Sequence, residues 1–149
     1  MTRRFLIPLV TLLLQLTSAP LRAQGYPPSQ RGTVSQRVAF TDVSIKYGRP
    51  TARGRALFGA LVPWDSIWHP GADVATQISI SRDVTLDGIA VAKGSYSAWL
   101  IPRATGAWTF ILNRKTNIQH TPYPGASFDA LRLDVVPDQA TAVETLTYQ

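Results

Sequence analysis

Residues 95–101 read Ser-Tyr-Ser-Ala-Trp-Leu-Ile. Side chains alternate across a β-strand, so Tyr96 and Leu100 would share one face while Trp99 lies on the other. Both faces are largely apolar, which predicts a central strand that is covered on both sides, with Trp99 near a rim. Pro102 should end this strand, because proline has no amide hydrogen to donate to a ladder.

Strand signals continue on both sides of this stretch. Residues 75–81 alternate, with Ile78 and Ile80 on one face and polar side chains on the other. Asp87-Gly88 predicts a tight hairpin, because both central residues of such a turn need a positive φ. Nine short strands are expected, over residues 34–40, 43–47, 75–81, 84–86, 89–92, 95–101, 107–112, 131–135 and 142–148. The pattern therefore predicts an all-β fold, in which two antiparallel sheets pack as a jelly-roll-like β-sandwich.

Residues 47–73 interrupt the strand pattern. Aromatic, Gly, Pro and Arg residues crowd this stretch with no helical or strand period, beginning with Tyr47-Gly48-Arg49-Pro50. Regular backbone pairing alone cannot hold such a stretch, so specific side-chain packing must order it. We expect one long, ordered crossover loop between the sheets, in which Arg and Trp side chains substitute for missing backbone pairing.

The first 23 residues have the features of a secretory signal peptide. Arg3 and Arg4 precede an apolar stretch that is too short for a membrane anchor. We place cleavage after Ala23, so that residues 24–32 form a flexible lead-in and residues 33–149 form the β-sandwich domain. These features are typical of Sec export, and the Arg pair leaves a twin-arginine route open. We therefore expect the protein to be periplasmic or secreted.

The composition limits the function classes. The chain has 149 residues, and loss of residues 1–23 lowers its net charge from +6 to +3, because three arginines leave with them. Charges scattered singly over a weakly basic domain do not indicate a nucleic-acid partner. No later apolar run is long enough to cross a membrane. The absence of cysteine excludes disulfides, thiol catalysis and thiolate metal sites, and no cofactor is indicated.

Three arginines in the irregular stretch, Arg49, Arg53 and Arg55, are candidates for an anion or carboxylate clamp. Guanidinium groups bind oxyanions through two parallel hydrogen bonds. In the alternative, these side chains bond loop carbonyls and stack on Trp64 or Trp68, which would pin the loop instead of binding a ligand.

Histidine and carboxylate side chains form a second candidate group. Asp65, His69 and Asp73 are spaced by four residues, and His120 could join them as a metal ligand. Pro70 would break a helix between His69 and Asp73, and the chain has only two histidines to serve as metal ligands. We therefore assign no metal site, and the alternative is that these side chains are loop caps and turn residues.

The aromatic residues form a third group, which could bind sugar by stacking or could simply form the core. Among the tryptophans, Trp64 and Trp99 are expected to be the most exposed. The candidate binding residues from all three groups are Arg49, Arg55, Trp64, Trp68, His69 and Asp73.

Several motifs together resemble one family. They include Thr33-Val34-Ser35-Gln36-Arg37-Val38, Tyr47-Gly48-Arg49-Pro50, Phe58-Gly59-Ala60-Leu61-Val62-Pro63-Trp64, Pro70-Gly71-Ala72-Asp73-Val74-Ala75-Thr76, Gly94-Ser95-Tyr96-Ser97 and Trp108-Thr109-Phe110-Ile111-Leu112-Asn113. These motifs resemble a bacterial secreted family known as domain of unknown function 2911. The resemblance implies export and a compact β domain, and it implies no activity, substrate or cofactor. The family usually has Arg after the tryptophan that is Trp68 here and Asn in place of Asp73, so His69 and Asp73 depart from its pattern.

The last expected strand runs to the end of the chain without a turn or a cap. It would leave an unpaired edge. Since members of the family tend to continue with further strands, this segment is either an edge strand or the end of a truncated form of a longer domain.

The sequence favours a non-catalytic binding or structural module of the cell envelope, with a small ligand, a carbohydrate or an envelope protein as its partner. No catalytic residue is assigned, because the chain has no Gly-x-Ser-x-Gly motif and no recognisable triad. The alternative is a small hydrolase-like enzyme that uses Asp65, His69 and Asp73.

Overall fold

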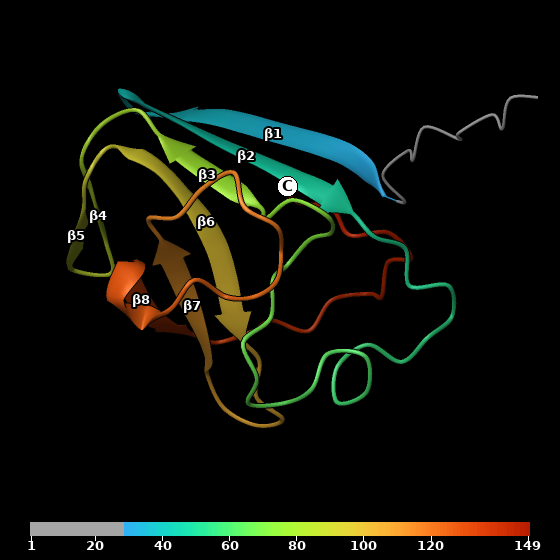
Figure 1. Ribbon diagram of the computed structural model, residues 1–149. Helices are drawn as coiled ribbons and strands as arrows, with labels where there is room; N and C mark the ends of the chain where they lie inside the picture. Colours follow the sequence, from blue (N-terminus) through green and yellow to red (C-terminus); the bar gives the residue numbers. More distant parts are fainter. Residues whose placement is uncertain (1–28) are drawn as a thin grey trace, which may run out of the picture.

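The protein is built on an antiparallel sheet of six strands with a two-stranded hairpin packed beside it (Figure 1). The computed structural model describes residues 29–149, so the expected signal peptide and most of the lead-in lie outside the described residues. The elements are β1 (Gln30–Val38), β2 (Thr41–Arg49), β3 (Gln77–Ile80), β4 (Val84–Leu86), β5 (Ile89–Val91), β6 (Gly94–Ile101), β7 (Trp108–Asn113), the 3₁₀-helix η1 (Ala126–Phe128) and β8 (Asp129–Val135). The main sheet has the order β1-β2-β3-β6-β7-β8, and β4 pairs with β5.

The all-β prediction is confirmed, and eight of the nine expected strands are present, seven of them with shifted ends. β1 begins at Gln30, three residues before the expected domain start at Thr33. The predicted hairpin lies between β4 and β5, where Asp87 has a φ of 48° and Gly88 a φ of 80°. Two consecutive positive φ angles give the turn whose twist matches that of the flanking strands.

Both faces of the sheet are covered around β6 and β7, as expected for a central strand. On one face the core consists of Ile80, Val91, Tyr96, Leu112 and Leu131, and the β4–β5 hairpin packs against it. On the other face Trp99 and Ile111 pack with Ala75, under Ile118 and Tyr123 of the loop that follows β7. Trp99 is only 2% exposed, so the expectation that it lies exposed at a rim is wrong. Its indole N–H donates to the hydroxyl of Ser97 at 2.9 Å, which satisfies its polar group inside the core.

The long irregular segment, residues 50–76, connects two neighbouring strands of the main sheet. It connects β2 to β3, which pair directly with each other, so it does not cross between two sheets as expected. Because β3 is short, the second half of β6 would lack a neighbour on that side. Trp68 fills this place by exchanging both backbone hydrogen bonds with Leu100, at 2.7 and 2.8 Å. Backbone pairing therefore contributes to the order of this segment, whereas the sequence predicted that Arg and Trp side chains would substitute for missing pairing.

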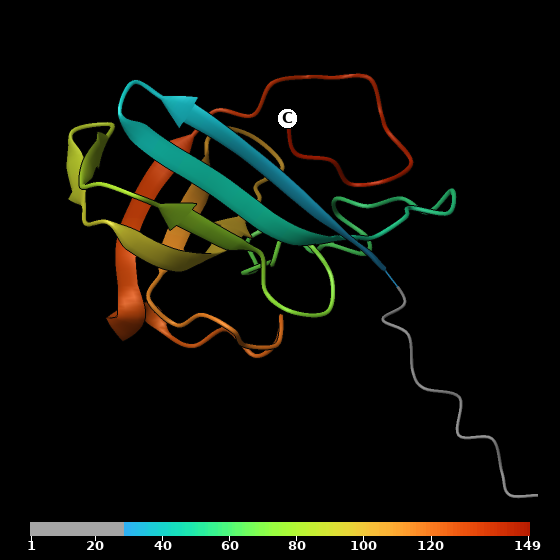
Figure 2. The same cartoon turned by 90° about the horizontal axis from the view of Figure 1, so that it is seen from above.

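The segment at the end of the chain, residues 136–149, is not a strand, so the ninth predicted strand is wrong. It lies beside the start of the irregular segment through a bridge between Thr51 and Thr145. A hydrogen bond from the amide of Leu146 to the carbonyl of Pro50 measures 3.0 Å. A ladder cannot extend there, because Pro50 has no amide hydrogen and the residues after it are irregular. Figure 2 shows this segment in red, curving away from the sheet on the side where the irregular segment lies.

Within residues 29–149, no helix is long and apolar enough to span a lipid bilayer.

The packing between the sheet and its covering loop can be tested at Ile111, whose exposed fraction is 0%. Ile111→Ala should lower the free energy of unfolding by about 2–5 kcal/mol, because the removed methyl groups leave a cavity. The matched control is Ile89→Ala in the hairpin, where the side chain is 39% exposed and the loss should stay below about 1 kcal/mol. Urea unfolding followed by tryptophan fluorescence measures both losses. Equal losses in the two variants would contradict the assignment of this core.

Candidate functional site

The six candidate binding residues lie in three neighbouring parts of the structure rather than in one cleft. His69 and Asp73 belong to a buried turn, residues 69–76, which we call the His69 turn. Trp64 and Trp68 belong to an aromatic cluster around Phe58. Arg49 and Arg55 hold the backbone at the edges of a groove that runs between the irregular segment and the end of the chain.

The His69 turn is closed by side-chain hydrogen bonds. Nε2 of His69 accepts the amide hydrogen of Thr76, and the hydroxyl of Thr76 donates to the carbonyl of Pro70 at 2.9 Å. The same carbonyl accepts the hydroxyl of Tyr148 at 2.8 Å. A Cβ at Gly71 would lie 2.7 Å from a ring carbon of His69, so the turn leaves no room for a larger residue there.

The ring of His69 is neutral and has a fixed tautomer. Because Nε2 accepts a backbone amide, the proton must be on Nδ1, which is buried and has no hydrogen-bond partner within residues 29–149. Burial lowers the pKa of His69 to about 4, and nearby His120 and Arg31 act in the same direction. Burial also raises the pKa of Tyr148. The histidine is therefore a structural acceptor, a role consistent with the expectation of a turn residue.

His120 is the second histidine that the structure brings to this turn. Its ring lies 5.9 Å from that of His69, and its amide and Nδ1 both bond the carbonyl oxygen of Asp73, at 3.0 and 2.8 Å. The carboxylate of Asp73 is not the group that His120 contacts, and one of its oxygens is buried without a partner among the described residues. Asp73 has a φ of 64°, which identifies it as a turn residue.

Asp65 lies away from this turn. Its amide bonds the carbonyl of Pro102 at 2.8 Å, at the end of β6, and its side chain is exposed. Across residues 29–149, no three His, Asp or Glu side chains gather closely enough to hold a metal ion. The expected set of Asp65, His69 and Asp73 therefore does not meet as a catalytic group.

The arginine side chains bond loop oxygens. Nε of Arg49 donates to the carbonyl of Leu146 at 3.3 Å, and its terminal nitrogen reaches the hydroxyl of Thr147. Arg55 donates to the carbonyls of Ala52 and Thr51, at 2.8 and 3.0 Å. Both guanidinium groups thus hold the backbone beside the groove. This is consistent with the alternative that these arginines bond loop carbonyls instead of binding a ligand.

Three of the four tryptophans pack around Phe58, a residue that the sequence reasoning did not single out. The ring of Phe58 stacks on Trp64 at 5.9 Å, meets the edge of Trp68 at 5.7 Å and contacts Trp108 at 4.8 Å. Gly59 has a φ of 80°, and a Cβ there would lie 2.5 Å from the indole nitrogen of Trp64. Gly59, which follows Phe58 in the sequence, could have indicated this cluster, since glycine lets the backbone approach an aromatic ring closely.

The groove has a volume of about 1020 Å³. Its floor includes Phe58, Leu61 and Trp68 of the irregular segment, and its opposite wall includes Ala142 and Val143. Leu61 is 53% exposed and Val143 is 65% exposed, so apolar surface faces the groove from its floor and from the opposite wall. Such a concave, mainly apolar space is typical of sites for small molecules.

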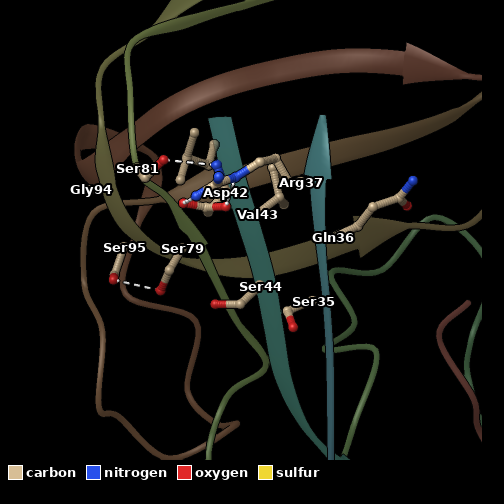
Figure 3. Close-up of a pocket in the computed structure, with 11 residues that line it drawn as sticks. Ser35, Gln36, Arg37, Asp42, Val43, Ser44, Ser79, Ser81, Gly94 and Ser95 are labelled. Atoms are coloured by element: carbon tan, nitrogen blue, oxygen red, sulfur yellow. Dashed lines mark hydrogen bonds and ion pairs between the residues drawn. The ribbon is translucent and has the colours of Figure 1, made fainter. Parts of the chain in front are cut away.

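A smaller cavity of about 520 Å³ lies at the far end of β1 and β2, over the open part of the sheet (Figure 3). Its lining includes Ser35, Ser44, Ser79, Ser95 and the pair formed by Arg37 with Asp42. The sequence pattern predicted a polar face on residues 75–81, which includes Ser79 and Ser81, but it did not indicate a cavity. The pairing register of strands that are distant in the chain creates it, and no single segment carries that information.

The role of His69 makes stability depend on pH. An ordinary histidine has a pKa of 6.5, and the pKa in the folded protein is about 4, so the unfolded chain binds a proton first as the pH falls. The contribution of His69 is complete above pH 6.5 and is lost between pH 6.5 and 4, by about 3 kcal/mol in total. His69→Gln keeps an acceptor for the Thr76 amide without the titration, so its unfolding free energy should vary less over this range.

Urea unfolding at a series of pH values measures this difference, with His120→Gln as the control that keeps His69. Equal pH dependence in the wild type and in His69→Gln would show that another group causes it.

The comparisons with known proteins identify a family and no activity. Neither a curated protein nor a solved structure matches the chain. A family model described as "Protein of unknown function (DUF2911)" matches residues 29–149, which is the whole of the described domain. The chain therefore belongs to the DUF2911 family of proteins of unknown function.

Proposed function

We propose that this protein is an exported, non-catalytic binding module that holds the apolar part of a small amphipathic molecule in the groove. The observation that carries the proposal is the groove itself, with its volume of about 1020 Å³ and with exposed apolar side chains on its floor and on its opposite wall. Exposed apolar surface of this kind on a soluble domain usually marks a site of interaction.

The floor of the groove is held more firmly than its opposite wall, which supports entry of a ligand from one side. The floor is fixed by the aromatic cluster and by the pairing of Trp68 with Leu100. The opposite wall is anchored at Glu144, Leu146 and Tyr148. Between β8 and these anchors, no hydrogen bond within residues 29–149 holds residues 136–143. This stretch can therefore move aside at little cost in free energy.

The chemistry of the groove favours an amphipathic molecule over a purely apolar one. Apolar side chains form the floor, whereas Arg55, Asp138 and Glu144 lie among the lining residues. Arg55 is occupied by two carbonyls, so it is not free to clamp an anion with its full set of donors. An uncharged polar end near these groups, with an apolar chain over Phe58 and Leu61, fits this distribution.

Export is supported by the N-terminal features of the sequence, namely two arginines before a short apolar stretch. An amphipathic ligand suits a protein of the cell envelope, where lipids and their fragments are abundant. The hydrolase-like alternative finds less support. His69 has one nitrogen bonded to Thr76 and the other buried, and Asp65 lies elsewhere, so these residues do not place a base beside a nucleophile.

The proposal predicts a specific loss of binding in Val143→Asp. Titration with N-phenyl-1-naphthylamine, an uncharged apolar fluorophore, should give saturable fluorescence in the wild type, and a monoacylglycerol below its critical micelle concentration should displace it. Val143→Asp should weaken the binding of the fluorophore and of the monoacylglycerol by at least about tenfold, because the bound molecule would cover a carboxylate that has no partner. The control is Val136→Asp, at a valine that is 80% exposed and does not line the groove.

Fluorescence that does not saturate with the folded wild-type protein would contradict the proposal. So would equal affinity in Val143→Asp and in the wild type. Since both valines are exposed, both variants should fold, and thermal melting checks this.

A further inference from the structure

Four serines form a straight row across four neighbouring strands of the main sheet. The pairing register puts Ser35 of β1 opposite Ser44 of β2, Ser44 opposite Ser79 of β3, and Ser79 opposite Ser95 of β6. Residues that pair directly point to the same face of a sheet, so the four hydroxyls share one surface. Figure 3 shows them following one another across the strands. We call this set the serine row.

The serine row lies on a part of the sheet that the covering loop leaves open. Over β6 and β7 the same face is closed by Ile118 and Tyr123, which pack on Trp99 and Ile111. Over β1, β2 and β3 the face instead borders the cavity of about 520 Å³. Ser35 and Ser95 are exposed, and Ser44 and Ser79 are half-buried.

The hydroxyls of the row differ in what they already bond. Ser79 and Ser95 bond each other at 2.8 Å, and the side-chain amide of Gln77 donates to the hydroxyl of Ser79 at 3.3 Å. Within the described part of the chain, no protein group bonds the hydroxyls of Ser35 or Ser44. Each hydroxyl can donate one hydrogen bond and accept two, so the row retains donors and acceptors for a ligand.

The charged side chains that line the cavity balance each other. Its lining has one basic and one acidic side chain, Arg37 and Asp42, and these form an ion pair at 2.6 Å. The backbone of Asp42 exchanges hydrogen bonds with Ser81, donating to its hydroxyl at 2.8 Å and accepting its amide at 3.0 Å. The pair is therefore fixed beside the row, near the turn between β1 and β2. A charged ligand would gain little net attraction from this neutralised pair, whereas a neutral ligand rich in hydroxyl groups needs none.

The length of the row favours a chain over a single small molecule. Neighbouring strands lie about 4.8 Å apart, so four strands place their hydroxyls over about 14 Å. A linear β-1,4-linked glycan repeats its hydroxyl groups at a spacing of similar order. No aromatic side chain is among the residues that line this cavity, so binding must come from hydrogen bonds that add up along the chain.

We propose that the serine row is a second binding site, and that it takes a neutral, linear glycan lying across β1, β2, β3 and β6. The site is separate from the groove of the proposed function, since no residue lines both cavities. It places carbohydrate recognition on hydroxyl groups, whereas sequence reasoning placed it on the tryptophans, which pack mainly against Phe58 or in the core.

Nuclear magnetic resonance titration of the ¹⁵N-labelled protein tests this proposal, with cellohexaose and chitohexaose as neutral probes and polygalacturonate as a charged comparator. The neutral probes should shift the amide signals of Ser35, Ser44 and Ser79 in a saturable way. Ser44→Ala/Ser79→Ala should weaken binding about 25-fold, at about fivefold for each hydroxyl removed. The matched control is Thr85→Ala/Ser127→Ala, which removes two exposed hydroxyls elsewhere.

Two results would overturn the proposal. One is that neither neutral probe shifts these amides of the folded protein, or that only polygalacturonate does. The other is that the double variant binds as tightly as the control. If the double variant does not fold, Ser35→Ala at the exposed edge strand gives the same test, with an expected loss of about fivefold. Val143→Asp should leave glycan binding unchanged, which separates this site from the groove.

Discussion

The hydrogen bond from the amide of Thr76 to Nε2 of His69 is the interaction on which the rest of this structure depends. It closes the His69 turn, and four distant parts of the chain meet there. The amide of Ala98 in β6 bonds the carbonyl of Thr76, and His120 in the loop after β7 bonds Asp73. Gly48 at the end of β2 packs so closely on Ala72 that a Cβ would overlap its carbonyl, and Tyr148 bonds Pro70. Without this turn, the sheet, its covering loop and the end of the chain would lose their common support.

Alternating and hairpin-forming sequences were the predictable part of the fold. Residues 95–101 and Asp87-Gly88 carry their structural information locally, through alternation and through turn residues. The connection from β2 to β3 was less predictable, because its pairing partner is Leu100, which lies more than 30 residues after Trp68 in the chain. The final segment was predicted as a strand from its composition, but a strand also needs a partner with free amides, and Pro50 cannot supply one.

The sequence predicted which region holds the candidate site residues, but it did not predict how their side chains are oriented. Arg49, Arg55, Trp64, Trp68, His69 and Asp73 do lie in neighbouring parts of the molecule, but their polar groups are mostly turned to the backbone. Residue types alone could not show this, because a histidine or an arginine that holds a loop looks the same in sequence as one that binds a ligand. Both proposed binding surfaces arise instead from segments that are distant in the chain. The groove lies between the irregular segment and residues 138–146, and the serine row depends on the register of four strands.

Hydrogen exchange at the amide of Thr76 tests the central role of the His69 turn most directly. At neutral pH, His69 is an unprotonated acceptor, and the turn should open only when the whole domain unfolds. We predict that the Thr76 amide exchanges as slowly as the amides of Ile111 and Leu112 in the sheet, with an opening free energy equal to that of global unfolding. Exchange of Thr76 as fast as that of residues 136–143 would contradict it, because the turn would then open while the sheet stays folded.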